Sequence, residues 1–141
     1  MAALTNKLIK EDATTLREAY RLRKREYEAL CSAAEWSGAV LHAGMLLELA
    51  LKIAICQNMD VTNLPQAFQI HDLGVLLYCS GLRNKIINNS DLQRNFGIIE
   101  SRWSMELRYK GATMAKQDSD EVHQALFDPS SGVLTFLSSF L

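Results

Sequence analysis

The stretch "AAEWSGAVLHAGMLLELALKIAICQNM", residues 33–59, decides the fold. Apart from two glycines it contains no helix breaker, and its apolar residues cover nearly every helix face between Met45 and Ile55. A helix that is apolar all round belongs at the centre of a helical bundle. Charged Glu48 and Lys52 would be costly in lipid, so we expect a buried core helix and not a membrane span.

Other helical segments flank this central helix. The expected segments run from about residue 11 to residues 30–34, from 71 to 80, from 91 to 109 and from 118 to 128. The last apolar stretch, 133–141, fits a short helix or a strand, and we favour a helix. Its apolar side chains either pack across the end of the bundle or are buried against another chain.

The segment 91–109 has the clearest single face. Steps of four, three, four and four residues predict one apolar stripe on a continuous helix. The stripe consists of Leu92, Phe96, Ile99, Trp103 and Leu107.

Length and composition favour one all-α domain over residues 1–141. The chain has 141 residues, enough for one compact domain, and only seven glycines and two prolines, too few for many short strands. The formal net charge of -1 gives no overall attraction to nucleic acid or to an anionic membrane. The sequence therefore predicts an antiparallel helical bundle without membrane association.

Cysteine usage and motifs give little indication of chemistry. The three cysteines lie far apart without CxxC or CxH spacing, so we expect neither a metal site nor a cofactor. The N-terminus lacks the apolar core of a signal peptide, and free thiols suit a reducing compartment, so a cytoplasmic location is expected. P-loop, dinucleotide-binding, HExxH and GxSxG motifs are all absent from the sequence.

Two polar pairs are the first candidates for a site. Glu48 and Lys52 are spaced i,i+4 and either line a polar pocket between helices or form a structural pair. His71 precedes Asp72 at an expected helix start, and a histidine can act as a general base near neutral pH. Adjacent residues do not face each other on a helix, so the alternative is that one of the two caps it.

Two groups of basic residues are further candidates. Arg17, Arg21 and Arg25 recur every four residues on one helix face, which fits either phosphate binding or a solvated charged face. The stretch "RWSMELRY", residues 102–109, joins cations and aromatic rings of the kind used for stacking and phosphate contact. The alternative for this stretch is that its tryptophan belongs to the core and Arg108 binds helix C-terminal carbonyls.

Three segments in order resemble the HEPN domain (higher eukaryotes and prokaryotes nucleotide-binding). They are "AGMLLELALKIAI", "HDLGVLLYCSGL" and "WSMELRY". In the family's motifs, Glu48 and Lys52 match an E-x-x-x-K arrangement, and residues 71–73 match an HDL element. Arg108 and Tyr109 match an RY that ends the next long helix.

The resemblance implies a fold and two possible activities. The implied fold is an up-and-down bundle of four long helices plus a short one, often paired as a homodimer. Many members partner a nucleotidyltransferase, and others are metal-independent toxin ribonucleases with an R-x(4–6)-H motif. Arg83-Asn84 resembles the opening of that motif, but Asn88, Asn89 and Ser90 occupy the positions required for its histidine.

The resulting hypothesis is a non-catalytic HEPN-like binding module. We expect a homodimer that binds a nucleotide, a nucleic acid such as RNA, or a partner nucleotidyltransferase. The alternative is a divergent ribonuclease of the toxin type, or a subunit of a toxin–antitoxin pair. The predicted ligand-binding residues are Glu48, Lys52, His71, Arg83, Arg102, Arg108 and Tyr109, and no catalytic residue is assigned.

Overall fold

The computed structural model describes residues 11–141, and regular structure in this range is helical apart from one isolated bridge between Asp12 and Asn63. This confirms the all-α prediction. The α-helices are α2 (Ala13–Ser32), α3 (Trp36–Asn58), α4 (Leu73–Cys79), α5 (Arg83–Ile87), α6 (Ser90–Arg102), α7 (Lys116–Phe127) and α8 (Val133–Phe136). Three 3-10 helices are η1 (Gln66–Phe68), η2 (Met105–Tyr109) and η3 (Ser138–Phe140).

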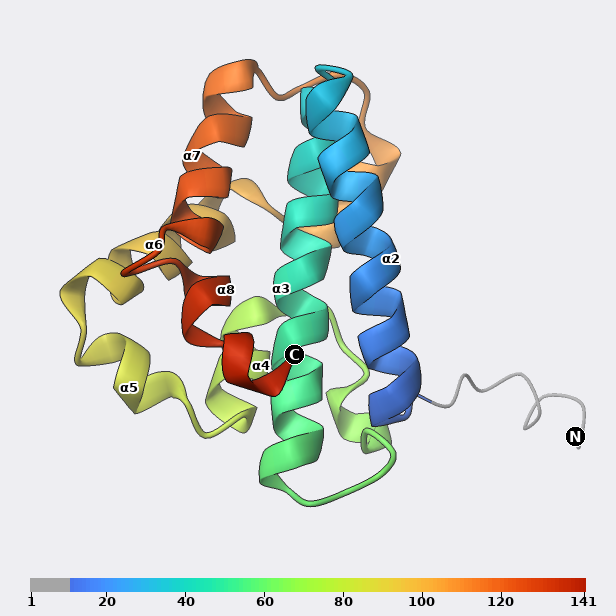
Figure 1. The fold of residues 1–141 in the computed structure, drawn as a ribbon, viewed down its shortest axis with the longest axis vertical. Coiled ribbons are helices and arrows are strands. Elements are labelled where there is room, and N and C mark those ends of the chain that lie inside the picture. Colours follow the sequence, from blue (N-terminus) through green and yellow to red (C-terminus); the bar gives the residue numbers. More distant parts are fainter. Residues whose placement is uncertain (1–10) are drawn as a thin grey trace, which may run out of the picture.

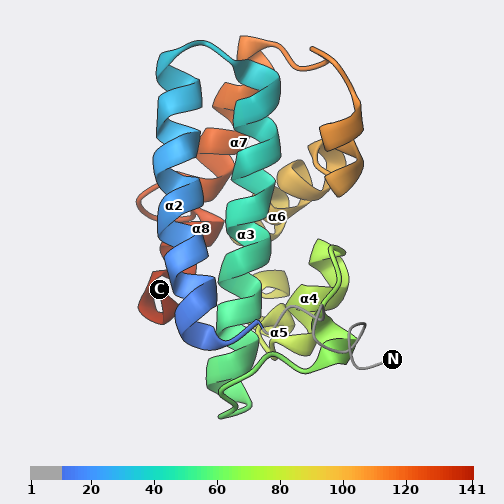
Figure 2. The ribbon, with the colours of Figure 1, turned by 90° about the vertical axis from the view of Figure 1, so that its right-hand side faces the viewer.

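The helix α3 is the centre of the fold, as its sequence predicts. It runs antiparallel to α2, while α7 lies on its other flank and α4 and α5 lie beside its C-terminal half (Figure 1). A perpendicular view places α6 on the side of α3 away from α2 (Figure 2). Length and composition alone would let α3 cross a membrane, but 78% of its most apolar window is buried inside this domain. Burial among other helices explains its apolar surface.

Side-chain caps begin three of the helices. Asp12 accepts a hydrogen bond from the Thr15 N–H at 2.7 Å and begins α2. Asp72 accepts from Val75 N–H at 3.0 Å and begins α4. Asn89 begins α6 in the same way. Each cap satisfies an N–H that the first helical turn cannot bond.

A glycine in the left-handed region ends the α4 segment, as the sequence predicts. Ser80 is the C-cap, and Gly81 follows with a φ of +78°, which a residue with a side chain rarely adopts. The chain then turns at once into α5, a short helix that begins at Arg83 and that the sequence did not predict.

The expected continuous helix over 91–109 is wrong. Helix α6 ends at Arg102, Trp103 is extended with φ −118° and ψ 135°, and η2 follows. The Trp103 indole turns onto α3 and donates from Nε1 to the Leu41 carbonyl oxygen at 2.9 Å. It fits because Gly44 has no side chain: a Cβ there would lie 2.1 Å from the ring. Arg108 and Tyr109 therefore end a 3-10 helix and not a long α-helix.

The C-terminal part of the chain completes the core. Helix α7 begins at Lys116, two residues before the predicted start, because the Asp118 carboxylate accepts the Ala115 N–H at 2.8 Å. The segment 133–141 is helical, as favoured. Its Val133, Leu134 and Leu137 are buried in the core, which matches packing across the bundle end.

Candidate functional site

The Glu48–Lys52 pair is buried on α3 and connects two other parts of the chain. Glu48 is 6% exposed and Lys52 3%. Lys52 Nζ lies 3.3 Å from Glu11 Oε2 and 4.0 Å from Glu48 Oε2. His71 Nδ1 lies 2.5 Å from Glu48 Oε1, and since an ionised carboxylate only accepts, Nδ1–H is the donor. These four residues form the charged cluster discussed below.

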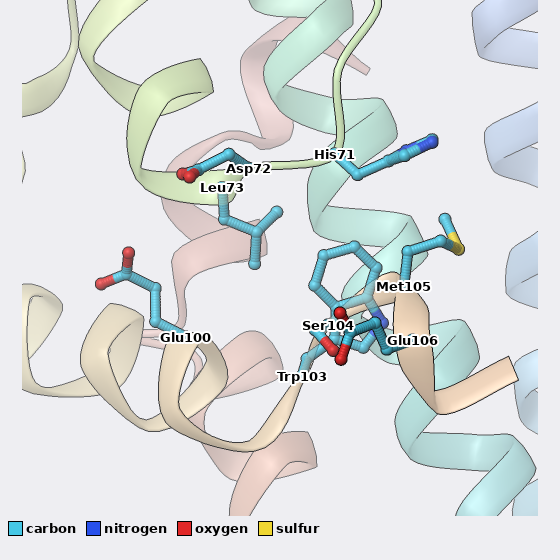
Figure 3. A pocket seen from close by; sticks show the side chains of 8 residues that line it. All are labelled: His71, Asp72, Leu73, Glu100, Trp103, Ser104, Met105 and Glu106. Carbon is cyan, nitrogen blue, oxygen red and sulfur yellow. The ribbon is translucent and has the colours of Figure 1, made fainter. Parts of the chain in front are cut away.

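The charged cluster holds His71 at the edge of a cavity of about 380 Å³. Its walls come from the start of α4, the end of α6 and the first residues of η2 (Figure 3). His71 and Asp72 point in opposite directions, and the Trp103 ring lies beneath Leu73. The lining residues are His71, Asp72, Leu73, Glu100, Trp103, Ser104, Met105 and Glu106. We call this space the His71 cavity.

Negative charge dominates the His71 cavity. Its lining contains three carboxylates, those of Asp72, Glu100 and Glu106, and neither lysine nor arginine. Burial, and then the negative charge of Asp72, raise the pKa of the Glu100 carboxyl. A cation or a hydrogen-bond donor would therefore be stabilised here, whereas a phosphate would be repelled.

Close helix packing places the Glu100 carboxylate. A Cβ at Gly74 would lie 2.8 Å from Glu100 Oε2, so the absence of a side chain on α4 makes room for the acid on α6. Glu100 also lines a second cavity of about 410 Å³, together with Arg83, Phe96 and Gly97. Arg83 thus lies in a different cavity from His71, and the structure does not bring the two together into one site.

The remaining predicted residues are also dispersed. Arg102 forms ion pairs with Asp118, at 3.6 Å from Nε, and with Glu121, and so ties α6 to α7. The Arg108 guanidinium lies 4.7 Å from the ring centroid of its neighbour Tyr109, which is 77% exposed. Of the seven predicted residues, Glu48, Lys52 and His71 form one connected group, while Arg108 and Tyr109 contact only each other among the seven.

Sequence reasoning missed most of the cavity lining. Asp72 was considered only as a partner for His71 or a cap, and it is the cap. Glu100, Ser104, Met105 and Glu106 were not singled out, because a continuous helix over 91–109 leaves no corner for a cavity. A break at Trp103 was the missing information, and neither glycine nor proline occurs between residues 98 and 109 to indicate it.

The described range provides no group of three or more histidine, cysteine, aspartate or glutamate side chains placed to hold a metal ion. Comparison of the chain with protein-family models, with curated proteins and with solved structures gave no match. The HEPN resemblance therefore rests on the sequence motifs alone.

Proposed function

We propose that the protein is a non-catalytic binding module that engages a partner protein through the His71 cavity. The observation that carries this proposal is the charge of the cavity: three carboxylates line it without any lysine or arginine. Among the ligands that the HEPN resemblance implies, a nucleotide and RNA bring phosphates, which these carboxylates repel. A basic side chain on a partner protein, such as a nucleotidyltransferase, fits the same charges.

Exposed apolar side chains on the helices that flank the cavity favour a protein partner. The elements that flank the cavity, α4 and η2, carry Val75, Tyr78 and Tyr109, which are 45%, 71% and 77% exposed. These are three of the five most exposed large apolar side chains of the described residues. Tyrosine is enriched in protein interfaces because it buries a large ring and retains a polar hydroxyl.

The dispersion of the basic residues favours binding over catalysis. In-line attack on RNA needs a general base and a cation near one phosphate. His71 is engaged by Glu48, and His123 Nδ1 is 2.8 Å from the Tyr27 hydroxyl on the far flank of the bundle. Arg83 and Arg108 belong to neither place.

The finer features expected from the sequence belong to the same proposal. We include in it an up-and-down core of four long helices, a homodimer and a cytoplasmic location. Sedimentation analysis tests the dimer directly, with an expected mass of twice the 15.8 kDa chain. A monomeric mass at high protein concentration would remove the dimer and leave the cavity proposal standing.

Isothermal titration calorimetry tests the ligand class. We expect a short oligolysine peptide, which presents only basic side chains, to bind the wild type in low salt, and ATP, GTP and mixed RNA to give no heat. Glu100→Gln with Glu106→Gln removes two cavity charges and should weaken peptide binding roughly tenfold. Glu18→Gln with Glu35→Gln removes two exposed charges elsewhere and is the matched control.

Two outcomes would overturn the proposal. Equal loss of peptide affinity in both double variants would show that only net charge matters. Cleavage of RNA by the purified protein, abolished by His71→Ala or Arg108→Ala, would favour the divergent ribonuclease instead.

A further inference from the structure

The basic face of α2 borders a groove that shares no lining residue with the His71 cavity. Arg17, Arg21 and Lys24 meet there at a groove of about 170 Å³, whose other walls are Tyr20, Ile53 of α3 and Leu141. From these groups we propose that the groove binds a small organic anion: a carboxylate or phosphate carried on a short apolar group.

None of the three cations forms an ion pair with a described residue. The ion pairs of the described residues engage Arg23, Lys52, Arg94, Arg102 and Lys116, but not Arg17, Arg21 or Lys24. Residues 1–10 contain no acidic side chain that would supply one. Like charges spaced by one helical turn repel each other, and a bound anion would relieve that repulsion.

One of the cations is already oriented by neutral acceptors. Arg17 donates from Nε and from a terminal nitrogen to the Phe140 carbonyl oxygen, both at 3.3 Å, and from that nitrogen to Gln57 Oε1 at 3.4 Å. These contacts fix the guanidinium at the groove without neutralising it. Lys24 lies with Nζ 6.0 Å from the Phe127 ring centroid, which also leaves its charge available.

Tyr20 supplies a neutral hydrogen-bond donor. Its residue is 8% exposed, and no hydrogen bond within the described residues engages its hydroxyl. Burial raises the pKa of Tyr20 to about 12, so the hydroxyl keeps its proton at neutral pH. The hydroxyl is not among the buried atoms of the described residues that lack a partner, so it is accessible at the groove, where an oxyanion would accept from it.

The floor of the groove determines the rest of the ligand. Ile53 is fully buried on α3 and, with Leu141, gives the groove an apolar floor. A volume of about 170 Å³ is smaller than an ordinary ligand pocket of roughly 300 Å³ or more, so only a compact group enters. We therefore assign the charged end to Arg21 and Lys24 and the apolar end to Ile53 and Leu141.

NMR titration of the nitrogen-15-labelled protein tests this site with defined probes. Hexanoate is expected to produce saturable shifts of the Tyr20, Arg21 and Lys24 amides that weaken in high salt. Hexylamine and hexanol, with the same tail but other head groups, are expected to produce none. Inorganic phosphate carries the charge without an apolar tail, so it should bind more weakly than hexyl phosphate.

Variants assign the contributions within the groove. Arg21→Gln with Lys24→Gln should abolish hexanoate binding, whereas Lys85→Gln with Lys110→Gln removes two exposed charges from other parts of the chain and should leave it unchanged. Tyr20→Phe deletes only the hydroxyl and should weaken binding about tenfold. Equal shifts with hexylamine, or equal loss in both double variants, would overturn the site, and neither result bears on oligolysine binding at the His71 cavity.

Discussion

Replacing Gly44 by alanine is expected to destabilise the protein, although alanine is the better helix former. The new Cβ would lie 2.1 Å from Cγ and Cδ1 of Trp103, so the indole has to move. Overpacking of this kind costs about 1 to 3 kcal/mol. Loss of the Nε1–H hydrogen bond to the Leu41 carbonyl adds about 1 kcal/mol. The gain in helix propensity offsets about 1 kcal/mol, which leaves a net cost of about 1 to 3 kcal/mol.

Urea unfolding followed by circular dichroism measures this difference. Gly97→Ala on α6 is the matched control, because nothing lies within 4 Å of a Cβ there, and it should be neutral or stabilising by up to about 1 kcal/mol. In a Trp103→Ala background the space next to Gly44 is free, so Gly44→Ala should no longer destabilise. A Gly44→Ala protein as stable as the wild type would refute the packing of the indole on α3.

Two further changes test the charges of the fold. Lys52→Met should cost about 3 to 5 kcal/mol of unfolding free energy, because it removes the buried ammonium from between Glu11 and Glu48 and leaves Glu48 only its His71 contact. The double variant Lys52→Met with Glu48→Leu should recover much of that loss, and no recovery would contradict the reasoning. Hydrogen bonds from the Ser131 and Ser130 backbone lower the pKa of Asp128 to about 2. The stability that its charge provides is therefore present above the usual pKa of 3.8 and is lost as the pH falls through about 2. The difference in unfolding free energy between wild type and Asp128→Asn should shrink over that range, and a constant difference would count against this.

The central helix was predictable because its information is local. Residues that are apolar on nearly every face between Met45 and Ile55 leave few alternatives to a buried helix, and the structure buries Leu46, Leu47, Leu51 and Ile53 completely. Local sequence also predicts the helix starts that have an aspartate cap and the helix end at Ser80-Gly81, because each depends only on neighbouring residues.

The candidate site was not predictable, because it depends on contacts between distant residues. The apolar stripe continues from Trp103 to Leu107 with helical spacing, so the sequence predicts one long helix. The indole turns away because Gly44, almost 60 residues earlier in the chain, offers it a place on α3. The resulting corner brings Glu100 beside Asp72 and creates the cavity.

The ion-pair partners of individual charged residues were likewise only partly predictable from the sequence. The i,i+4 spacing of Glu48 and Lys52 predicted their pairing, but not the His71 contact that joins α3 to the start of α4. Arg102 was assigned to ligand binding, and the structure engages it in ion pairs with α7. Whether a surface cation has a partner is determined by the neighbouring helix, which a single helical pattern does not reveal.

Calorimetric titration of the oligolysine peptide into wild type and into Glu100→Gln with Glu106→Gln tests the central claim most directly. A binding module that uses the acidic His71 cavity should bind the peptide, and the cavity variant should lose about tenfold in affinity while the control variant does not. Wild-type affinity in the cavity variant, or tighter binding of ATP or RNA than of the peptide, would contradict the claim.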